Sequence, residues 1–139
     1  MNKTAIITLL AAVTLSGCSH PHLSADTLQH HRYELVSIDG AAINAQNPQK
    51  PTLEFGENMH VSGKMCNRFN GQGQLADNVL TVKTMMSTRM LCADPQLNQG
   101  DMLLAEMLEK GAKVSLQAQK LTLTQGQHQL IYQLKELVN

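Results

Sequence analysis

The sequence predicts an α+β domain in which a small, twisted or barrel-like antiparallel sheet packs against one main helix. Short runs of alternating apolar and polar residues, separated by turn residues, fill most of the chain after residue 31. Only the segment 94–111 instead spaces its apolar residues as an amphipathic helix does. With 139 residues, the chain has the length of one domain.

Alternation and turn residues predict the first strands. The strand-forming segments are 32–43, 52–55, 59–63 and 68–84. Asp39-Gly40 divides the first segment and Asp77-Asn78 divides the last, and both dipeptides favour the tight turn of a hairpin. We therefore expect a hairpin at each end of this half of the chain.

The helix is predicted by its ends as well as by its period. Asp94 is a suitable N-cap, Pro95 suits the first helical position, and Gly111 is a suitable C-cap. The apolar stripe consists of Leu97, Leu104, Met107 and Leu108, with Met102 and Leu103 beside it. Because Gly100 costs about 1 kcal/mol relative to alanine within a helix, a later start at Asp101 is an alternative.

Three strands are expected after the helix. Apolar residues alternate around positions 114–116, 121–123 and 130–132. Turns are predicted near Gln119-Lys120 and Gln125-Gly126. The order of elements is thus many short strands interrupted by a single helix, which is typical of the α+β class.

Residues 1–17 have the features of a signal peptide. Lys3 supplies a positive charge, and an apolar stretch that is too short for a stop-transfer helix follows it. The next residues, Leu-Ser-Gly-Cys, resemble the bacterial lipobox. Cys18 is therefore predicted to be lipidated and to become the first residue of the mature chain.

Lipidation at Cys18 would hold the protein at a membrane, because two or more acyl chains give a stable anchor. The next residue, Ser19, is not aspartate, which resembles the sorting signal for the bacterial outer membrane. Residues 18–27 are expected to be the lipidated N-terminus and a tether, and residues 28–139 the folded domain, which would face the periplasm.

The two other cysteines, Cys66 and Cys92, are expected to pair. The predicted compartment favours oxidation, and lipidation of Cys18 leaves an even number. A bond across 26 positions would stabilise the fold by roughly 3.5 kcal/mol. Free buried thiols, or a catalytic Cys66 with His60 as its base, remain as alternatives. The spacing is not that of a redox pair, and two cysteines are too few for a zinc site.

Composition argues against several functions. The chain has 11 basic and 11 acidic residues, no basic stripe and few aromatic side chains, so nucleic acid is not an expected partner. No catalytic triad, phosphate-binding loop or pair of catalytic carboxylates is evident, and we expect neither enzymatic activity nor a cofactor. His20, His22, His30 and His31 lie close in sequence but lack the spacing of a metal site, so no metal is predicted either.

The stretch Gly63–Gly73 (GKMCNRFNGQG), followed by Leu80–Cys92, a helix and terminal strands, resembles the META domain of the HslJ family. The matching residues are Cys66, Asn67, Gly71, Thr88, Met90 and Cys92. The resemblance covers about residues 28–138, although Tyr33 stands where many members have tryptophan. It implies a small envelope lipoprotein linked with heat stress and with resistance to novobiocin, and it supplies no catalytic residues.

A candidate ligand surface consists of Asn67, Asn70, Met102 and Met107. Asn67 and Asn70 could bind a ligand, although asparagine and glycine also satisfy the backbone of a tight turn. The chain has eight methionines, which fill irregular cores, form adaptable apolar surfaces or, when clustered, bind Cu(I). Packing is the favoured interpretation here. Any exposed groove is expected between the segment around Met85–Met90 and the two helical methionines.

Together, these features predict a non-catalytic, lipid-anchored envelope protein that acts in stress tolerance through an unknown envelope partner. The alternative is a lipoprotein that binds a small amphipathic ligand or antibiotic.

Overall fold

The computed structural model describes residues 17, 21–44 and 46–138. The predicted signal peptide, apart from Gly17, and the predicted lipidation site Cys18 lie outside these residues. No helix in the described part of the chain has the length and apolar character needed to cross a membrane.

The described chain contains the strands and the main helix in the predicted order. The elements are α1 (Ala25–Leu28), β1 (His31–Ile38), β2 (Ala41–Ala42), β3 (Thr52–Phe55), the 3-10 helix η1 (Glu57–Met59), β4 (His60–Lys64), β5 (Arg68–Ala76), β6 (Val79–Ser87), α2 (Pro95–Lys110), β7 (Ala112–Gln117), β8 (Lys120–Gln125) and β9 (His128–Leu137). The α+β class is therefore confirmed.

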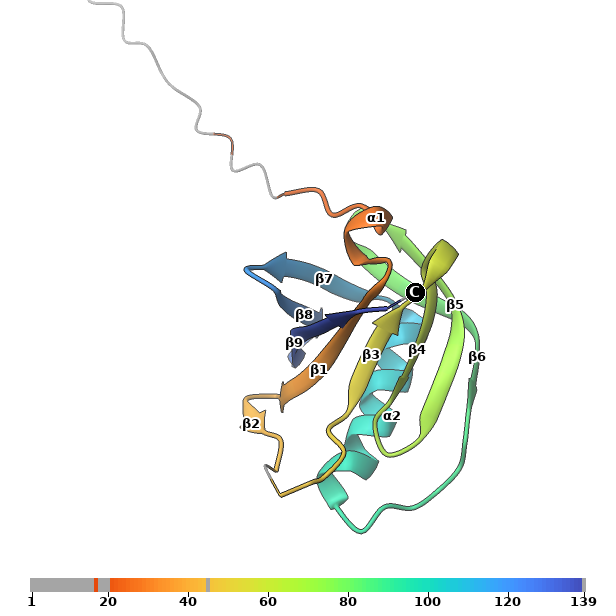
Figure 1. Ribbon diagram of the computed structural model, residues 1–139, viewed down its shortest axis with the longest axis vertical. Coiled ribbons are helices and arrows are strands. Elements are labelled where there is room, and N and C mark those ends of the chain that lie inside the picture. The colour runs from red at the N-terminus through yellow and green to blue at the C-terminus, as the bar shows by residue number, and fades with distance from the viewer. Residues whose placement is uncertain (1–16, 18–20, 45, 139) are drawn as a thin grey trace, which may run out of the picture.

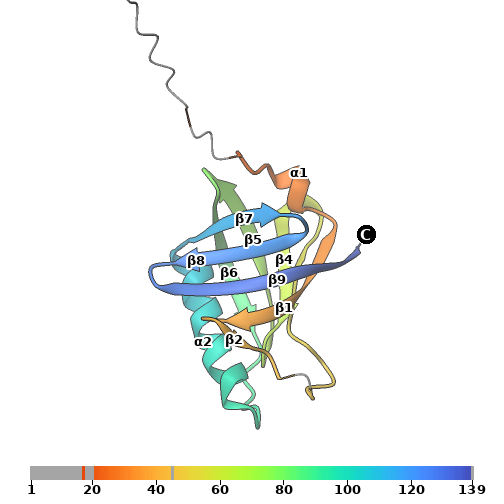
Figure 2. The same cartoon turned by 90° about the vertical axis from the view of Figure 1, so that its left-hand side faces the viewer.

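The antiparallel sheet closes into a barrel of eight strands. The strand order is β1-β3-β4-β5-β6-β7-β8-β9, and β9 pairs back onto β1. The two-residue β2 only extends the β1 hairpin. Closure removes the free edges that an open sheet would expose. Figures 1 and 2 show the strands curving around a common interior.

The helix α2 lies beside the strand pair of the barrel that has the fewest paired residues, β6 and β7. β6 and β7 pair only at Val79–Lys113 and Leu80–Ala112. α2 connects these two strands and packs against β6, with its buried side chains facing the barrel. Those residues are Leu97, Gly100, Leu104, Met107 and Leu108. Most of the predicted apolar stripe is thus confirmed as core.

The ends of α2 follow the sequence prediction. Asp94 accepts a hydrogen bond from the backbone N–H of Gln96 at 2.9 Å, and Gly111 adopts a φ of 107° after the last turn. The alternative start at Asp101 is wrong, since the helix includes Gly100. A Cβ at this position would lie 2.8 Å from the Sδ atom of Met65, so the glycine permits close packing of the helix on the β4–β5 turn.

The predicted turns are close to the observed ones. Asp39-Gly40 and Asp77-Asn78 have the positive φ angles of tight hairpin turns, as predicted. The turn between β7 and β8 lies at Ala118 and Gln119, one residue before the predicted position. Gly126 lies in the β8–β9 turn, again as predicted.

The ordered fold starts earlier than residue 28. The backbone N–H of Leu23 donates to Oδ1 of Asn78 at 2.7 Å, and Leu28, at the end of α1, is fully buried. Residues 23–27, predicted as tether, therefore belong to the folded structure. The reason is that apolar side chains in this segment, Leu23 and Ala25, pack on the core despite showing no regular period.

Candidate functional site

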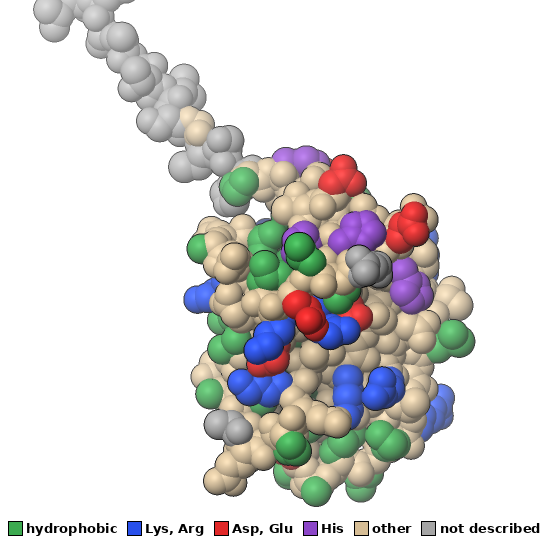
Figure 3. Space-filling model, in the orientation of Figure 1, with side chains coloured by type: hydrophobic (Ala, Val, Ile, Leu, Met, Phe, Trp, Pro, Cys, Tyr) green, Lys and Arg blue, Asp and Glu red, His purple; other side chains and the backbone are tan. Residues whose placement is uncertain are grey.

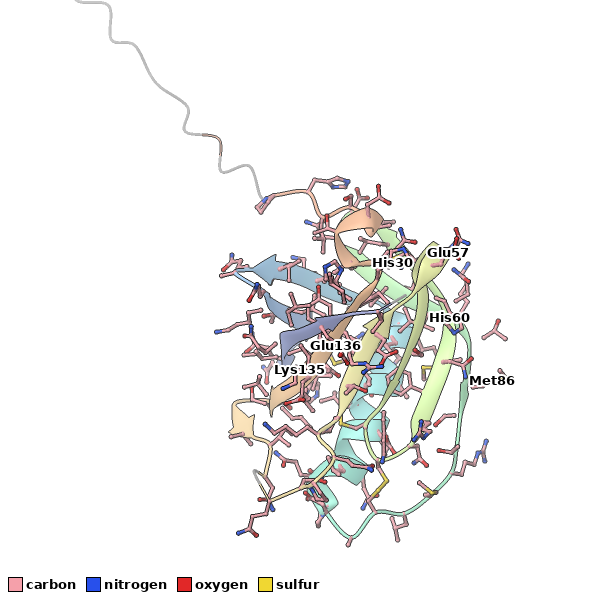
Figure 4. The ribbon with its side chains drawn as sticks, in the orientation of Figure 1. His30, Glu57, His60, Met86, Lys135 and Glu136 are labelled. Atoms are coloured by element: carbon pink, nitrogen blue, oxygen red, sulfur yellow. A yellow bond between two sulfur atoms is a disulfide. The ribbon has the colours of Figure 1, made fainter. Side chains whose placement is uncertain are left out.

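Cys66 and Cys92 form a disulfide with an S–S distance of 2.06 Å. The bond joins the turn between β4 and β5 to the segment that precedes α2. Because the sulfur of Cys66 is in a disulfide, it provides no thiolate for catalysis or metal binding. His60, proposed as a base for that thiol, lies at the opposite end of β4, opposite Gln72 (Figure 4).

Asn67, the residue after the first cysteine, uses its side chain inside the protein. Its Nδ2 donates to the carbonyl of Met90 at 3.0 Å and to Oδ2 of Asp101 at 2.5 Å. Its Oδ1 accepts from the N–H of Met90 at 2.6 Å and from the hydroxyl of Thr88 at 2.9 Å. The amide is thus saturated and buried, so Asn67 positions backbone and does not face a ligand.

Asp101 holds the other side of this network. Its Oδ1 accepts from the backbone N–H groups of Cys66 at 2.9 Å and Asn67 at 3.0 Å. The carboxylate therefore connects α2 to the β4–β5 turn. This role was not predicted from the sequence, although a signal was present. Asp101 follows Leu97 by four residues and precedes Leu104 by three, which puts a carboxylate on the buried face of the helix.

The four residues of the predicted ligand surface do not lie together on one surface. Met107 is fully buried, whereas the side chain of Met102 is 76% exposed. Asn70 lies on the outer face of β5, opposite Ser62, and is half-buried. Met102 and Met107 face different sides of α2, so, contrary to the prediction, they do not together line a groove with the segment around Met85–Met90.

A different apolar surface is present near the disulfide. Four of the six large hydrophobic side chains that are exposed in the described part of the chain come from the end of β6, the β6–α2 connection and α2. These residues, Met86, Met90, Leu91 and Met102, are called the Met/Leu surface. Leu91 is 88% exposed. Figure 4 shows Met86 projecting from the outer edge of β6, and Figure 3 shows apolar side chains along the lower rim of the molecule.

Hydrogen bonds fix the backbone beneath the Met/Leu surface. Met90 is held by Asn67, and Cys92 exchanges two hydrogen bonds with the side chain of Asn98, at 2.9 and 2.8 Å. Met102 lies one helical turn beyond Asn98, on the same side of α2. Met90 also borders a cavity of about 500 Å³ whose wall includes both cysteines and Asp94. The apolar side chains are thus presented from a rigid support.

The histidines form no metal centre in the described ranges, where no group of three or more His, Cys, Asp or Glu side chains is arranged to hold an ion. Figure 4 shows His30 and His60 near the same end of the barrel. His20 lies outside the described residues.

The family model of the META domain matches residues 26–136, and this range contains the disulfide, the Asn67 network and all of the barrel except Leu137, the last residue of β9. The chain belongs to the META domain family. It is 43% identical to the heat shock protein HslJ of Escherichia coli (strain K12), over 143 aligned residues that cover 100% of both chains. The predicted resemblance is therefore confirmed.

Two solved structures share the fold. One, determined by NMR, is 44% identical, has a TM-score of 0.75, and is matched over 80% of this chain and 94% of its own. The other, an NMR structure of a protein from Burkholderia xenovorans, has a TM-score of 0.65 at 22% identity and covers 97% and 99% of the two chains. At that identity the second likeness concerns the fold alone.

Proposed function

We propose that this protein is a lipid-anchored protein of the bacterial outer membrane, with its domain in the periplasm, that contributes to stress tolerance by binding an apolar partner. Its action is non-catalytic and needs no cofactor. The observation that carries the proposal is the Met/Leu surface, a set of exposed apolar side chains of which Met90 and Leu91 lie on a backbone segment fixed by a disulfide and a buried amide network.

The membrane location is supported by the N-terminal sequence, which matches a lipobox at Cys18. A disulfide between Cys66 and Cys92 suits an oxidising compartment such as the periplasm. The stress context is supported by the 43% identical relative, whose name is heat shock protein HslJ. Tolerance of heat and of novobiocin is the corresponding role that we propose for this chain.

The N-terminal tether and the β6–α2 connection lie at opposite ends of the domain, which favours a binding surface that faces away from the membrane. In Figure 1 the chain enters the fold beside α1, and the β6–α2 connection lies at the other end of the domain. A domain tethered at Cys18 would therefore present the Met/Leu surface away from the bilayer. Methionine side chains are flexible and polarizable, which lets one surface fit apolar partners of different shapes. Stress that exposes apolar segments of envelope proteins would provide such partners.

The triple variant Met90→Gln, Leu91→Gln and Met102→Gln should lose the protective function. Because these side chains are exposed, their replacement is expected to change stability by less than about 0.5 kcal/mol each and to leave the protein level unchanged. Survival after heat challenge and growth with novobiocin should fall to the level of a strain that lacks the gene. Immunoblots of the membrane fraction would confirm equal amounts of protein.

The matched control is Leu137→Gln, which replaces another exposed leucine, 73% exposed, at the end of β9. It should protect as the wild type does. Full protection by the triple variant would contradict the proposal. Loss of novobiocin tolerance on Leu116→Gln alone would instead favour the alternative, an amphipathic-ligand binder, since Leu116 lines a cavity of about 480 Å³ beside residues 21–23.

A further inference from the structure

A second surface, on the outer face of β3, β4 and β5, contains a polar hollow of about 480 Å³. Its lining residues are Thr52, Glu54, His60, Ser62, Gly63, Lys64, Arg68, Phe69 and Asn70. Figure 3, drawn in the orientation of Figure 1, shows Lys and Arg side chains gathered on this side of the molecule. The hollow is separate from the Met/Leu surface in its residues and in its chemistry.

Lys64 and Arg68 are directly opposite each other in the β4–β5 pair. Residues opposite each other in an antiparallel pair point to the same face, and like charges in this position destabilise the sheet. No carboxylate in the described part of the chain forms an ion pair with either residue. Because Lys64 and Arg68 lie opposite each other without a counterion among the described residues, we expect an anion from outside the chain to bind between them.

The nearby polar groups do not neutralise this charge. The Nζ atom of Lys64 donates to Oε1 of Gln49 at 2.6 Å, a neutral acceptor. Glu54 is the one carboxylate among the lining residues, and it forms an ion pair with Arg32 on the neighbouring strand. Both cations therefore keep their charge available to the hollow.

Three other lining residues have neutral side chains that can donate hydrogen bonds. Ser62 and Asn70 are opposite each other in the same strand pair, two residues along from Lys64 and Arg68 and therefore on the same face. Thr52 is opposite Lys64 on the other side of β4. Two hydroxyls, one amide and two cations thus converge on one face. An arginine fork combined with a lysine point charge is a common arrangement for binding phosphate oxygens.

We infer that this hollow binds a phosphate group, with Lys64 and Arg68 supplying the charge and Ser62, Asn70 and Thr52 supplying further hydrogen bonds. The group could belong to free inorganic phosphate or to the headgroup of a lipid. Both sources present the same tetrahedral set of oxygen acceptors. The inference does not depend on the apolar partner proposed above.

A titration of the full chain in a non-ionic maltoside detergent, which carries no phosphate, tests the site. At constant ionic strength, sodium phosphate should shift the backbone amide NMR signals of Ser62, Lys64, Arg68 and Asn70. It should also raise the melting temperature of the protein. In the double variant Lys64→Gln and Arg68→Gln, the affinity should fall about tenfold or more. Without phosphate, this variant should melt no lower than wild type, because the opposed charges are gone.

The matched control is Lys83→Gln with Lys120→Gln, which removes two exposed lysines on strands outside the hollow. Its phosphate affinity should equal that of the wild type. Unchanged phosphate affinity in the Lys64/Arg68 variant, an equal loss in the control, or no shift in wild type would overturn the inference. A parallel titration with glycerol 3-phosphate distinguishes the sources: tighter binding than inorganic phosphate assigns the site to a lipid headgroup, and weaker binding assigns it to the free ion.

Discussion

Replacing Cys66 and Cys92 with alanine should lower the free energy of unfolding by about 3.5 kcal/mol. The disulfide closes a loop across 26 positions, which restricts the unfolded chain. Small domains are stable by only about 5–15 kcal/mol, so this loss would be a large fraction of the total. Urea denaturation followed by far-ultraviolet circular dichroism would measure it.

Reduction provides the control for this variant. A reductant should destabilise the wild type by a similar amount, and should leave the double alanine variant unchanged because it has no disulfide to reduce. If the wild type unfolds at the same urea concentration with and without reductant, the disulfide does not contribute to stability. Because Cys66 is almost fully buried, alanine is preferred to serine, whose hydroxyl would need a partner.

The substitution Asp101→Asn should lower the free energy of unfolding by about 3 kcal/mol. The carboxylate accepts hydrogen bonds from two backbone N–H groups and from the side chain of Asn67. An asparagine of the same shape has one amide oxygen in place of two carboxylate oxygens and brings an N–H₂ group against those donors. At least one buried donor then lacks an acceptor, and hydrogen bonds to charged groups are among the stronger ones.

Denaturation and hydrogen exchange would measure the effect of Asp101→Asn. Besides the lower stability, the amide of Met90 should exchange faster, since it donates to Asn67, which Asp101 holds in place. The control is Glu106→Gln on the exposed side of the same helix, where solvent screens the ion pair with Lys110 and its loss should change stability little. If both substitutions lowered the free energy of unfolding equally, the Asn67–Asp101 network would contribute no more to stability than an exposed ion pair does.

Features determined by neighbouring residues were predictable from the sequence. The ends of α2 follow from Asp94, Pro95 and Gly111, and the hairpins follow from dipeptides that favour positive φ angles. The disulfide was predictable from the compartment and the cysteine count. Each of these depends on a few adjacent residues or on a constraint that leaves few choices.

Features that depend on residues far apart in the chain were not predictable from the sequence. Closure of the barrel requires β1 to pair with β9, for example Arg32 with Glu136, and no local pattern specifies this register. The contact between Asn67 and Asp101 spans 34 positions. Met102 and Met107 were assigned to one surface, yet five positions rotate a helix by about 140°, so one side chain is exposed and the other is core.

The stability network and the proposed binding surface share the same backbone. Asn67 and Asn98 hold the segment that presents Met90 and Leu91. In the proposed function, the buried asparagine next to Cys66 fixes the backbone that carries the exposed binding side chains. Rigid support lowers the entropy lost on association, because the backbone of the binding segment is already ordered.

The proposal that the domain works while tethered to a membrane is tested most directly by the intact mass of the protein extracted from the membrane fraction of cells that make it. The proposal predicts a chain that begins at Cys18, carries the mass of added acyl chains, and is two hydrogen atoms lighter than its reduced form because of the Cys66–Cys92 disulfide. The variant Cys18→Ser should lose the acyl mass and leave the membrane fraction. An unacylated wild-type chain in the soluble fraction would contradict the account.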